Sequence, residues 1–272
     1  MLPVESISTS DYVGDLMLHH LSNIADRVQR VVKAMPSTCE MGEELCMGAD
    51  GTPTLRIDRL AEDAILEYVN QEKLKWNILS EEAGYIDNGG DRTLVIDPID
   101  GTYNAVIGIP FYSVSLALGS STMSDVDMAY VRNVVTGDTY QAVKGEGAKL
   151  NGRKIHTRPL AKDMVLLIYM GCHASDDTLR CIKKARRTRS LGCSSLELAL
   201  VAQGTADAFY LKSGQRERAI RVVDIAASAL ILREAGGDLC DLSGETLDMP
   251  FDLKVRSNFL AYGDQSVKGV LL

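Results

Sequence analysis

The chain has 272 residues, of which 46% are hydrophobic and 24% are charged, and its formal net charge at pH 7 is −8. This length and apolar content are sufficient for one large domain or for two packed lobes. The acidic charge argues against a general binder of nucleic acids or of anionic membranes.

The chain also lacks the sequence features of secreted, zinc-binding and membrane proteins. Its six cysteines form no C-x-x-C pair, and the four histidines add no zinc-site spacing. The N-terminus has acids and hydroxyls where a signal peptide has a basic start and an apolar core, and no apolar run is long enough to span a membrane. We therefore expect a cytoplasmic protein with reduced thiols and no membrane partner.

Two helices are predicted in the N-terminal quarter of the chain. Apolar residues recur at helical spacing over residues 11–34 and again over residues 57–71. Asp58 stands in the first turn of the second helix, where the helix dipole favours a carboxylate, so helix capping is its simplest interpretation. Residues 36–54 carry glycines and Pro53 without any period, and they predict a long mobile loop, either a functional lid or a disordered surface excursion.

A short strand over residues 75–79 ends in the sequence Ser80-Glu-Glu-Ala-Gly84. The simplest interpretation of Glu81 and Glu82 is a solvated turn. However, a strand that ends in acidic residues before a glycine occurs again about twenty residues later, in the segment described next.

The most informative segment is 94–118, LVIDPIDGTYNAVIGIPFYSVSLAL. Its first apolar residues predict a buried strand, which we expect to break at Pro98, because proline cannot donate to a sheet ladder. Asp97 and Asp100 flank this break. Two carboxylates so close together at a desolvated strand end repel each other unless a cation lies between them, and oxygen ligands suit Mg²⁺, Mn²⁺ or Ca²⁺.

The next two residues, Gly101 and Thr102, add a possible anion site. Glycine lets the backbone approach a ligand closely, and backbone N–H groups at the start of a helical turn can bind phosphate. The segment therefore predicts a site for a metal and a phosphate. Asp-Pro and Asp-Gly are also common turn dipeptides, so this pattern alone leaves a simple turn open.

The remaining elements divide the chain into two parts. Three strands over residues 111–119, 126–135 and 138–143 predict an antiparallel meander, and Asn151-Gly152 predicts a hairpin turn. Beyond it, strands and helices alternate: strands at 164–169, 206–211 and 257–262, and helices at 176–187, 194–202 and 224–235. We expect an N-terminal α+β lobe (1–160) with the metal site and a C-terminal α/β lobe (161–272) with substrate contacts, as one integrated unit.

Asp224 and the basic residues before it allow two interpretations. Asp224 precedes an apolar helix and could be its N-cap, or it could be a metal ligand that the fold brings to the segment 94–118. Arg216, Arg218 and Arg221 lie just upstream, and residues 183–189 are also basic. Most charge runs are solvated faces, but arginine is suited to bidentate phosphate recognition.

Together these motifs resemble the inositol monophosphatase superfamily, and within it the archaeal-type fructose-1,6-bisphosphatase/inositol-1-monophosphatase branch. The matching motifs follow the family order over most of the chain: GADGTPT at 48–54, SEEAG at 80–84, DPIDGT at 97–102, LGCSSL at 191–196 and VDIAA at 223–227.

The resemblance implies an α/β (α+β) fold, a layered αβαβα sandwich, and a Mg²⁺-dependent phosphatase with two or three ions, for which Mn²⁺ is a possible substitute. The implied metal ligands are Glu81, Asp97, the backbone carbonyl of Ile99, Asp100 and Asp224. The implied catalytic residues, which orient the attacking water, are Asp58, Glu81 and Thr102. The implied substrate-binding residues are Asp100, Gly101, Thr102, Arg189, Ser194, Arg218 and Arg221.

The implied substrates are small sugar or inositol phosphates: fructose 1,6-bisphosphate, inositol monophosphate, or both, hydrolysed by a metal-activated water. Leu211 stands where inositol-specific relatives have a glutamate, which favours a substrate with a second phosphate. The alternatives are a 3′(2′),5′-bisphosphate nucleotidase of the same superfamily and a non-catalytic regulatory protein that binds metal or phosphate. The resemblance also implies a homodimer.

Overall fold

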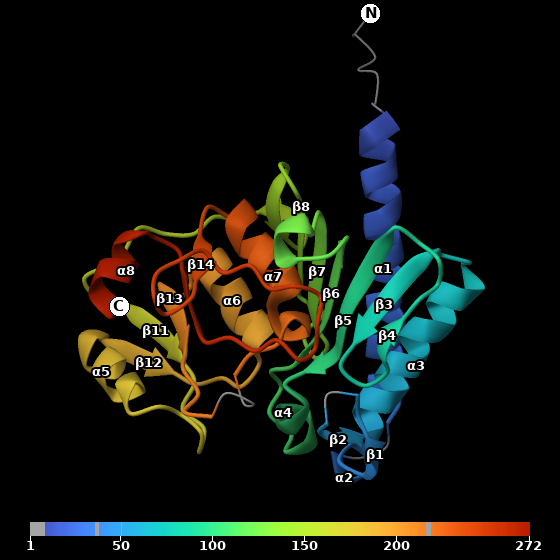
Figure 1. The fold of residues 1–272 in the computed structure, drawn as a ribbon, viewed down its shortest axis with the longest axis horizontal. Helices are drawn as coiled ribbons and strands as arrows, with labels where there is room; N and C mark the ends of the chain where they lie inside the picture. Colours follow the sequence, from blue (N-terminus) through green and yellow to red (C-terminus); the bar gives the residue numbers. More distant parts are fainter. Residues whose placement is uncertain (1–8, 36–37, 50, 216–218) are drawn as a thin grey trace, which may run out of the picture.

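Five alternating layers of helices and strands make up the chain, in the αβαβα order that the resemblance implies (Figure 1). The computed structural model describes residues 9–35, 38–49, 51–215 and 219–272. The layers, in order, are a helix pair, an eight-stranded sheet, a second helix pair, a five-stranded sheet and a third helix pair.

The first layer holds α1 (Thr9–Lys33) and α3 (Arg56–Gln71), which confirms both helices predicted in this region. Their apolar faces, which include Leu21 and Ile65, are buried against one face of the large sheet. Because side chains alternate along a strand, Ile78 and Leu94 point toward these helices, whereas neighbouring side chains point to the other face of the sheet.

The eight-stranded sheet has the order β10-β9-β8-β7-β6-β5-β3-β4. Its strands are β3 (Trp76–Ser80), β4 (Gly84–Ile86), β5 (Arg92–Asp100), β6 (Ser113–Gly119), β7 (Met128–Asn133), β8 (Thr139–Val143), β9 (Gly147–Leu150) and β10 (Arg153–Lys154). β3 and β5 are parallel, and the other neighbouring strands are antiparallel. The predicted meander and the hairpin at residues 151–152 are therefore confirmed.

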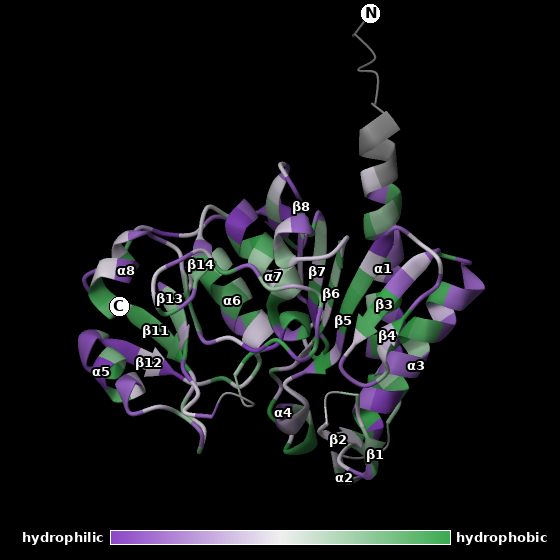
Figure 2. Ribbon diagram, in the orientation of Figure 1, coloured by the Kyte–Doolittle hydropathy of each residue, from purple (hydrophilic) through white to green (hydrophobic). Residues whose placement is uncertain are grey.

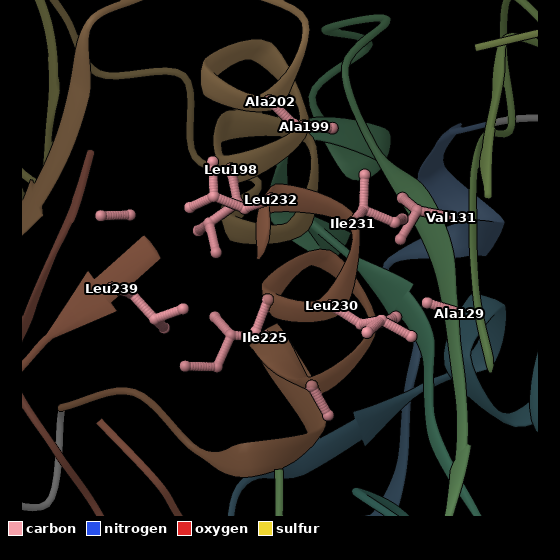
Figure 3. Close-up of a cluster of buried hydrophobic side chains, with 14 of the residues drawn as sticks. Ala129, Val131, Leu198, Ala199, Ala202, Ile225, Leu230, Ile231, Leu232 and Leu239 are labelled. Carbon is pink, nitrogen blue, oxygen red and sulfur yellow. The ribbon is translucent and has the colours of Figure 1, made fainter. Parts of the chain in front are cut away.

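The central layer consists of two largely apolar helices. They are α6 (Ser194–Ala202) and α7 (Val222–Glu234), which lie between the two sheets and are mostly hydrophobic in Figure 2. Figure 3 shows Leu198 of α6 beside Leu232 of α7, with Ile231 directed at Val131 of β7. A helix with apolar residues on all sides is stable only where it is covered on all sides, which explains its place between two sheets.

The second sheet has the order β12-β11-β13-β15-β14 and is covered on its outer face by two short helices. Its strands are β11 (Val165–Ile168), β12 (Arg187–Arg189), β13 (Ala208–Leu211), β14 (Asp238–Cys240) and β15 (Phe259–Tyr262). The outer helices are α5 (Asp177–Lys184) and α8 (Ser266–Leu271). Side chains of β11 alternate here too, since Leu167 packs against the central helices and Leu166 against the outer ones.

Three local predictions are wrong. The segment 36–54 is not without regular structure, because its described part contains α2 (Thr38–Met41), β1 (Glu44–Met47) and β2 (Pro53–Leu55), the last two paired as a hairpin. The basic helix predicted over residues 176–187 ends at Lys184, because the residues after it pair with β11 as β12. The hairpin of β1 and β2 is short and largely exposed, so it has no period in the sequence. β12 forms by pairing with β11, some twenty residues earlier, and local periodicity does not report such a pairing.

The third error concerns Pro98. β5 does not end there but continues to Asp100, with a register shift against β6 between Asp97 and Asp100. Proline is tolerated at such a bulge because the ladder is locally interrupted. The bulge gives the two aspartates different surroundings.

The two lobes predicted for residues 1–160 and 161–272 share a core. One apolar cluster contains Val95 of the large sheet, Phe209 of the small sheet and most of α7. The two sheets are separate in sequence, since the first ends at Lys154 and the second begins at Val165. The division into lobes remains a prediction.

All six cysteines are free, as expected: Cys39, Cys46 and Cys172 are exposed, and Cys181, Cys193 and Cys240 are buried. Within the described ranges, the helices fall short of the length and apolar character that a membrane crossing requires.

Candidate metal centre and active site

Three carboxylates from distant parts of the sequence meet where β3 and β5 end and α7 begins. Glu81 follows β3, Asp97 lies on β5 and Asp224 lies in the first turn of α7. Each offers an oxygen within 4.8 Å of the oxygens of the other two. The chain thus brings together three of the four acidic side chains that were predicted as metal ligands.

The electrostatics of this carboxylate cluster favour a bound cation. Burial raises the pKa of Asp97 well above its ordinary value, and the charges of Glu81, Asp100 and Asp224 raise it further. Asp97 Oδ1 is buried without a hydrogen-bond partner, which is costly for a carboxylate oxygen. Hard oxygen donors with an unsatisfied buried oxygen among them fit a divalent cation such as Mg²⁺ or Mn²⁺.

Arg221, which was predicted to bind substrate, lies directly on the carboxylate cluster. Its Nη1 is 2.6 Å from Glu81 Oε1, and its Nη2 is 2.8 Å from Asp224 Oδ1. Its backbone N–H donates to Asp224 Oδ2 at 2.8 Å. Asp224 is therefore the third residue of α7 and not its N-cap, since the helix begins at Val222.

Asp100 is held apart from these three carboxylates by the start of α6. Its Oδ2 accepts hydrogen bonds from the Ser195 backbone N–H and hydroxyl, both at 2.6 Å, and from the Cys193 thiol at 3.2 Å. Its Oδ1 accepts the Ser194 N–H at 3.2 Å. Asp100 is buried, and burial raises the pKa of its carboxyl, while the hydrogen bonds from Ser195 lower it.

The predicted catalytic pair, Asp58 and Thr102, is in contact. Thr102 Oγ1 lies 2.9 Å from Asp58 Oδ1 and 2.8 Å from the carbonyl oxygen of Ile99. Burial raises the pKa of Asp58 to about 7, against the lowering effect of the Thr102 hydroxyl. A carboxyl with a pKa near neutrality that is joined to a hydroxyl is suited to accept a proton from a bound water.

Gly101 separates Asp100 from α4 (Thr102–Val106) and has a left-handed backbone, with φ of +85°. A Cβ atom at this position would lie 3.0 Å from Cys193 Cβ and 3.1 Å from the Gly192 carbonyl oxygen. The close approach of the two loops therefore requires glycine at position 101.

The loop before α6 is fixed by two buried side chains that were not predicted as site residues. Asn104 Nδ2 donates to the carbonyl oxygens of Phe111 at 2.8 Å and Leu191 at 2.7 Å. Glu197 Oε1 accepts the Leu191 N–H at 3.1 Å. Burial raises the pKa of Glu197 to about 8, so this carboxyl is largely protonated at neutral pH.

A cavity of about 280 Å³ opens beside the carboxylate cluster. Glu81, Asp224 and Arg221 line one part of it, and Ser194, another predicted substrate residue, also lines it. Its other lining residues are Thr52, Tyr169, Ser190, Gly192, Glu197, Phe209, Leu211, Ala219, Ile220 and Arg256. Such a cavity, with charged groups on an apolar base, is typical of a small-molecule site.

Of the other predicted arginines, the structure describes only Arg189. Arg189 is exposed and donates to the carbonyl oxygen of Thr188, and it does not line the cavity. Arg218 lies outside the described residues. Arg256, which sequence reasoning missed, does line the cavity, and it also lines a neighbouring hollow with Ser213 and Asn258. It stands in no motif, so only the fold identifies it.

The layered fold places a cluster of acidic side chains at the strand ends beside a small-molecule cavity, an arrangement suited to metal-dependent chemistry on a small substrate. The family model described as "Inositol monophosphatase family" matches residues 20–268. The chain belongs to the inositol monophosphatase family and is a phosphatase.

Individual relatives agree with this assignment. A fructose-1,6-bisphosphatase/inositol-1-monophosphatase of Methanothermobacter thermautotrophicus is 38% identical over 257 residues, which cover 89% of this chain and 90% of the relative. A bifunctional NADP phosphatase/NAD kinase of Methanococcus maripaludis is 36% identical over 266 residues. The matched region covers 88% of this chain but only 46% of that longer relative. A solved inositol monophosphatase–fructose 1,6-bisphosphatase superposes with a TM-score of 0.82 at 31% identity, over 93% of this chain and 98% of that one.

Proposed function

We propose that this phosphatase is a Mg²⁺-dependent phosphomonoesterase that hydrolyses fructose 1,6-bisphosphate, inositol monophosphate, or both, by means of a metal-activated water. The observation that carries the proposal is the carboxylate cluster of Glu81, Asp97 and Asp224, with its unsatisfied Asp97 oxygen. Asp100 and the Ile99 carbonyl complete the proposed ligand set. When bound, two or three Mg²⁺ ions would polarise the phosphate and lower the pKa of a bound water, and Mn²⁺ is a possible substitute.

The residues of the chain have distinct tasks in this mechanism. Asp58 and Thr102, joined by a hydrogen bond of 2.9 Å, hold the attacking water, and the Asp58 carboxylate accepts its proton. Glu81 belongs to the carboxylate cluster and also lines the cavity, and in this mechanism it orients that water. The phosphate to be hydrolysed lies against Asp100, Gly101 and Thr102.

The composition of the cavity supports a substrate with a second anionic group. Arg256 lines the same cavity as Glu81 and Asp224, and Leu211 supplies an apolar wall at the position that the resemblance marks as a glutamate in inositol-specific enzymes. An arginine suits a second phosphate because its guanidinium can donate two parallel hydrogen bonds. This favours fructose 1,6-bisphosphate over inositol monophosphate.

A second candidate is a phosphatase that acts on a phosphorylated nucleotide. It is favoured by the similarity to the bifunctional NADP phosphatase/NAD kinase, which also covers most of this chain. A 3′(2′),5′-bisphosphate nucleotidase, the alternative named in the sequence analysis, would also act on a phosphorylated nucleotide.

Release of inorganic phosphate from a panel of substrates separates these candidates. The panel contains fructose 1,6-bisphosphate, inositol 1-phosphate, NADP and adenosine 3′,5′-bisphosphate, each at equal concentration with Mg²⁺. We expect the highest kcat/KM for fructose 1,6-bisphosphate. A preference for either nucleotide would replace the proposed substrate, and tight Mg²⁺-dependent binding without turnover would support a regulatory protein instead.

The homodimer is part of the same proposal. Light scattering of the purified protein at micromolar concentration should give twice the mass of 29.6 kDa expected for one chain. A monomer mass would contradict this part of the proposal.

A further inference from the structure

The most elaborate hydrogen bonding around the carboxylates of the site converges on a single atom, Asp100 Oδ2. Three donors reach it: the Ser195 N–H and hydroxyl, each at 2.6 Å, and the Cys193 thiol at 3.2 Å. A carboxylate oxygen has about two lone-pair sites, so these donors leave Oδ2 no capacity for a further ligand. Within the part of the chain that the structure describes, Oδ1 accepts only the Ser194 N–H, at 3.2 Å, and so keeps one lone pair.

The hydroxyl of Ser195 is itself oriented by a second buried serine. Ser113 Oγ lies 2.6 Å from Ser195 Oγ, and both residues are fully buried. A hydroxyl has one proton, so when Ser195 donates to Asp100, the Ser113 hydroxyl must donate to Ser195. The donor chain therefore runs from Ser113 on β6 through Ser195 on α6 to Asp100 on β5.

This donor chain joins segments that are distant in sequence. Asp100 ends β5, and Ser194 and Ser195 are the first two residues of α6, a helix of nine residues. Their N–H groups lie in the first turn of the helix, where backbone N–H groups have no hydrogen-bond acceptor within the helix and attract a carboxylate. Asp100 is thus fixed at both oxygens before any ion binds.

We propose that Ser195, oriented by Ser113, is a positioning residue that restricts Asp100 to metal binding through Oδ1 alone. The inference rests on the proposed function, because Asp100 is a proposed ligand. Groups that orient metal ligands typically contribute 10- to 100-fold to metal affinity. Loss of the Ser195 hydroxyl removes one of the three donors to Oδ2, while the backbone N–H groups and the Cys193 thiol still hold the carboxylate, so we expect an effect at the lower end of this range.

Calorimetric titration of the full-length protein with Mg²⁺ alone tests this inference without use of substrate. Ser195→Ala should bind Mg²⁺ about 10-fold more weakly than the wild type. Ser113→Ala should lose affinity in the same direction but less, and it serves as the second variant if Ser195→Ala does not fold. Thr178→Val is the matched control, because it also removes a buried hydroxyl, on α5, far in sequence from the carboxylates, and should leave Mg²⁺ affinity unchanged.

Asp100→Asn separates the inference from the proposed function. If Asp100→Asn weakens Mg²⁺ binding while both serine variants bind like the wild type, the positioning role is overturned and the metal site stands. If Asp100→Asn itself binds Mg²⁺ like the wild type, Asp100 is no ligand, and both this inference and that part of the proposed function fail. Weaker binding in Ser195→Ala and Asp100→Asn, with an unchanged control, supports the inference.

Discussion

Gly101 offers a sharp test of how the two loops of the site fit together, through the substitution Gly101→Ala. The backbone at this position is left-handed, with φ of +85°, and a Cβ atom would come within 3.0 Å of Cys193 Cβ and within 3.1 Å of the Gly192 carbonyl oxygen. Gly192 and Cys193 belong to the loop that leads into α6, and the end of this loop and the start of α6 hold Asp100 by hydrogen bonds. The substitution therefore adds backbone strain and a steric conflict at the centre of the site.

Gly145→Ala separates the two effects. Gly145 has almost the same backbone, with φ of +87°, but among the described residues no atom other than those of its chain neighbours lies within 4 Å of the Cβ position. A left-handed alanine costs about 1–2 kcal/mol, and this is the whole expected loss for Gly145→Ala. Overpacking adds about 1–3 kcal/mol, so the free energy of unfolding should fall by about 2–5 kcal/mol for Gly101→Ala.

Urea unfolding measures both losses, and phosphate release measures activity. We expect Gly101→Ala to be less stable than Gly145→Ala and to lose most of its kcat, because relief of the conflict moves the loop that holds Asp100. Gly145→Ala should keep wild-type kcat. Equal losses of stability in the two variants, or wild-type kcat in Gly101→Ala, would refute this reasoning.

Three further substitutions test single side chains of the site. Burial raises the pKa of Glu197 from 4.5 to about 8, so the stability of the wild type should fall as pH rises between these values. The melting temperature of Glu197→Gln, relative to that of the wild type, should therefore rise from about pH 5 to about pH 9. A difference in melting temperature that stays constant with pH would contradict this prediction. Thr102→Val, which removes the hydroxyl that contacts Asp58, should lower kcat about 100-fold, whereas Thr102→Ser should keep most of the activity, and equal activities would exclude the role of the hydroxyl. Arg256→Met should raise KM for fructose 1,6-bisphosphate about 10-fold and leave KM for inositol 1-phosphate unchanged. Lys254→Met, at an exposed lysine, is the control. An equal change in KM for both substrates would show that Arg256 does not recognise the second phosphate.

The sequence alone predicts the parts of the molecule in which local pattern and final packing agree. The stripe of α3 has a strong helical period, and the strands of the meander from β6 to β8 pair with neighbours that are close in sequence. The hairpin of β1 and β2 is short and largely exposed, so it has no period to detect. β12 exists only because it pairs with β11, some twenty residues earlier.

The same distinction holds for the site. Asp97, Asp100 and Glu81 are recognisable because each stands beside a strand end within a motif. The contact of Asp224 with Glu81 and Asp97 needs the fold, as does the place of Arg221 on these carboxylates. The hydrogen bond between Ser113 and Ser195 spans 82 positions, and no local spacing reports it.

The central claim is that the carboxylate cluster holds the divalent cation needed for phosphate release. The most direct measurement is phosphate release from fructose 1,6-bisphosphate and inositol 1-phosphate by the wild type and by Asp97→Asn, with Mg²⁺ and with EDTA. Asp97→Asn keeps the shape of the side chain but removes one carboxylate from the cluster that Asp97 forms with Glu81 and Asp224. We predict Mg²⁺-dependent release by the wild type that EDTA abolishes and that is lost in Asp97→Asn. Phosphate release by the wild type that persists in EDTA would contradict the claim. So would phosphate release by Asp97→Asn that depends on Mg²⁺ in the same way as in the wild type.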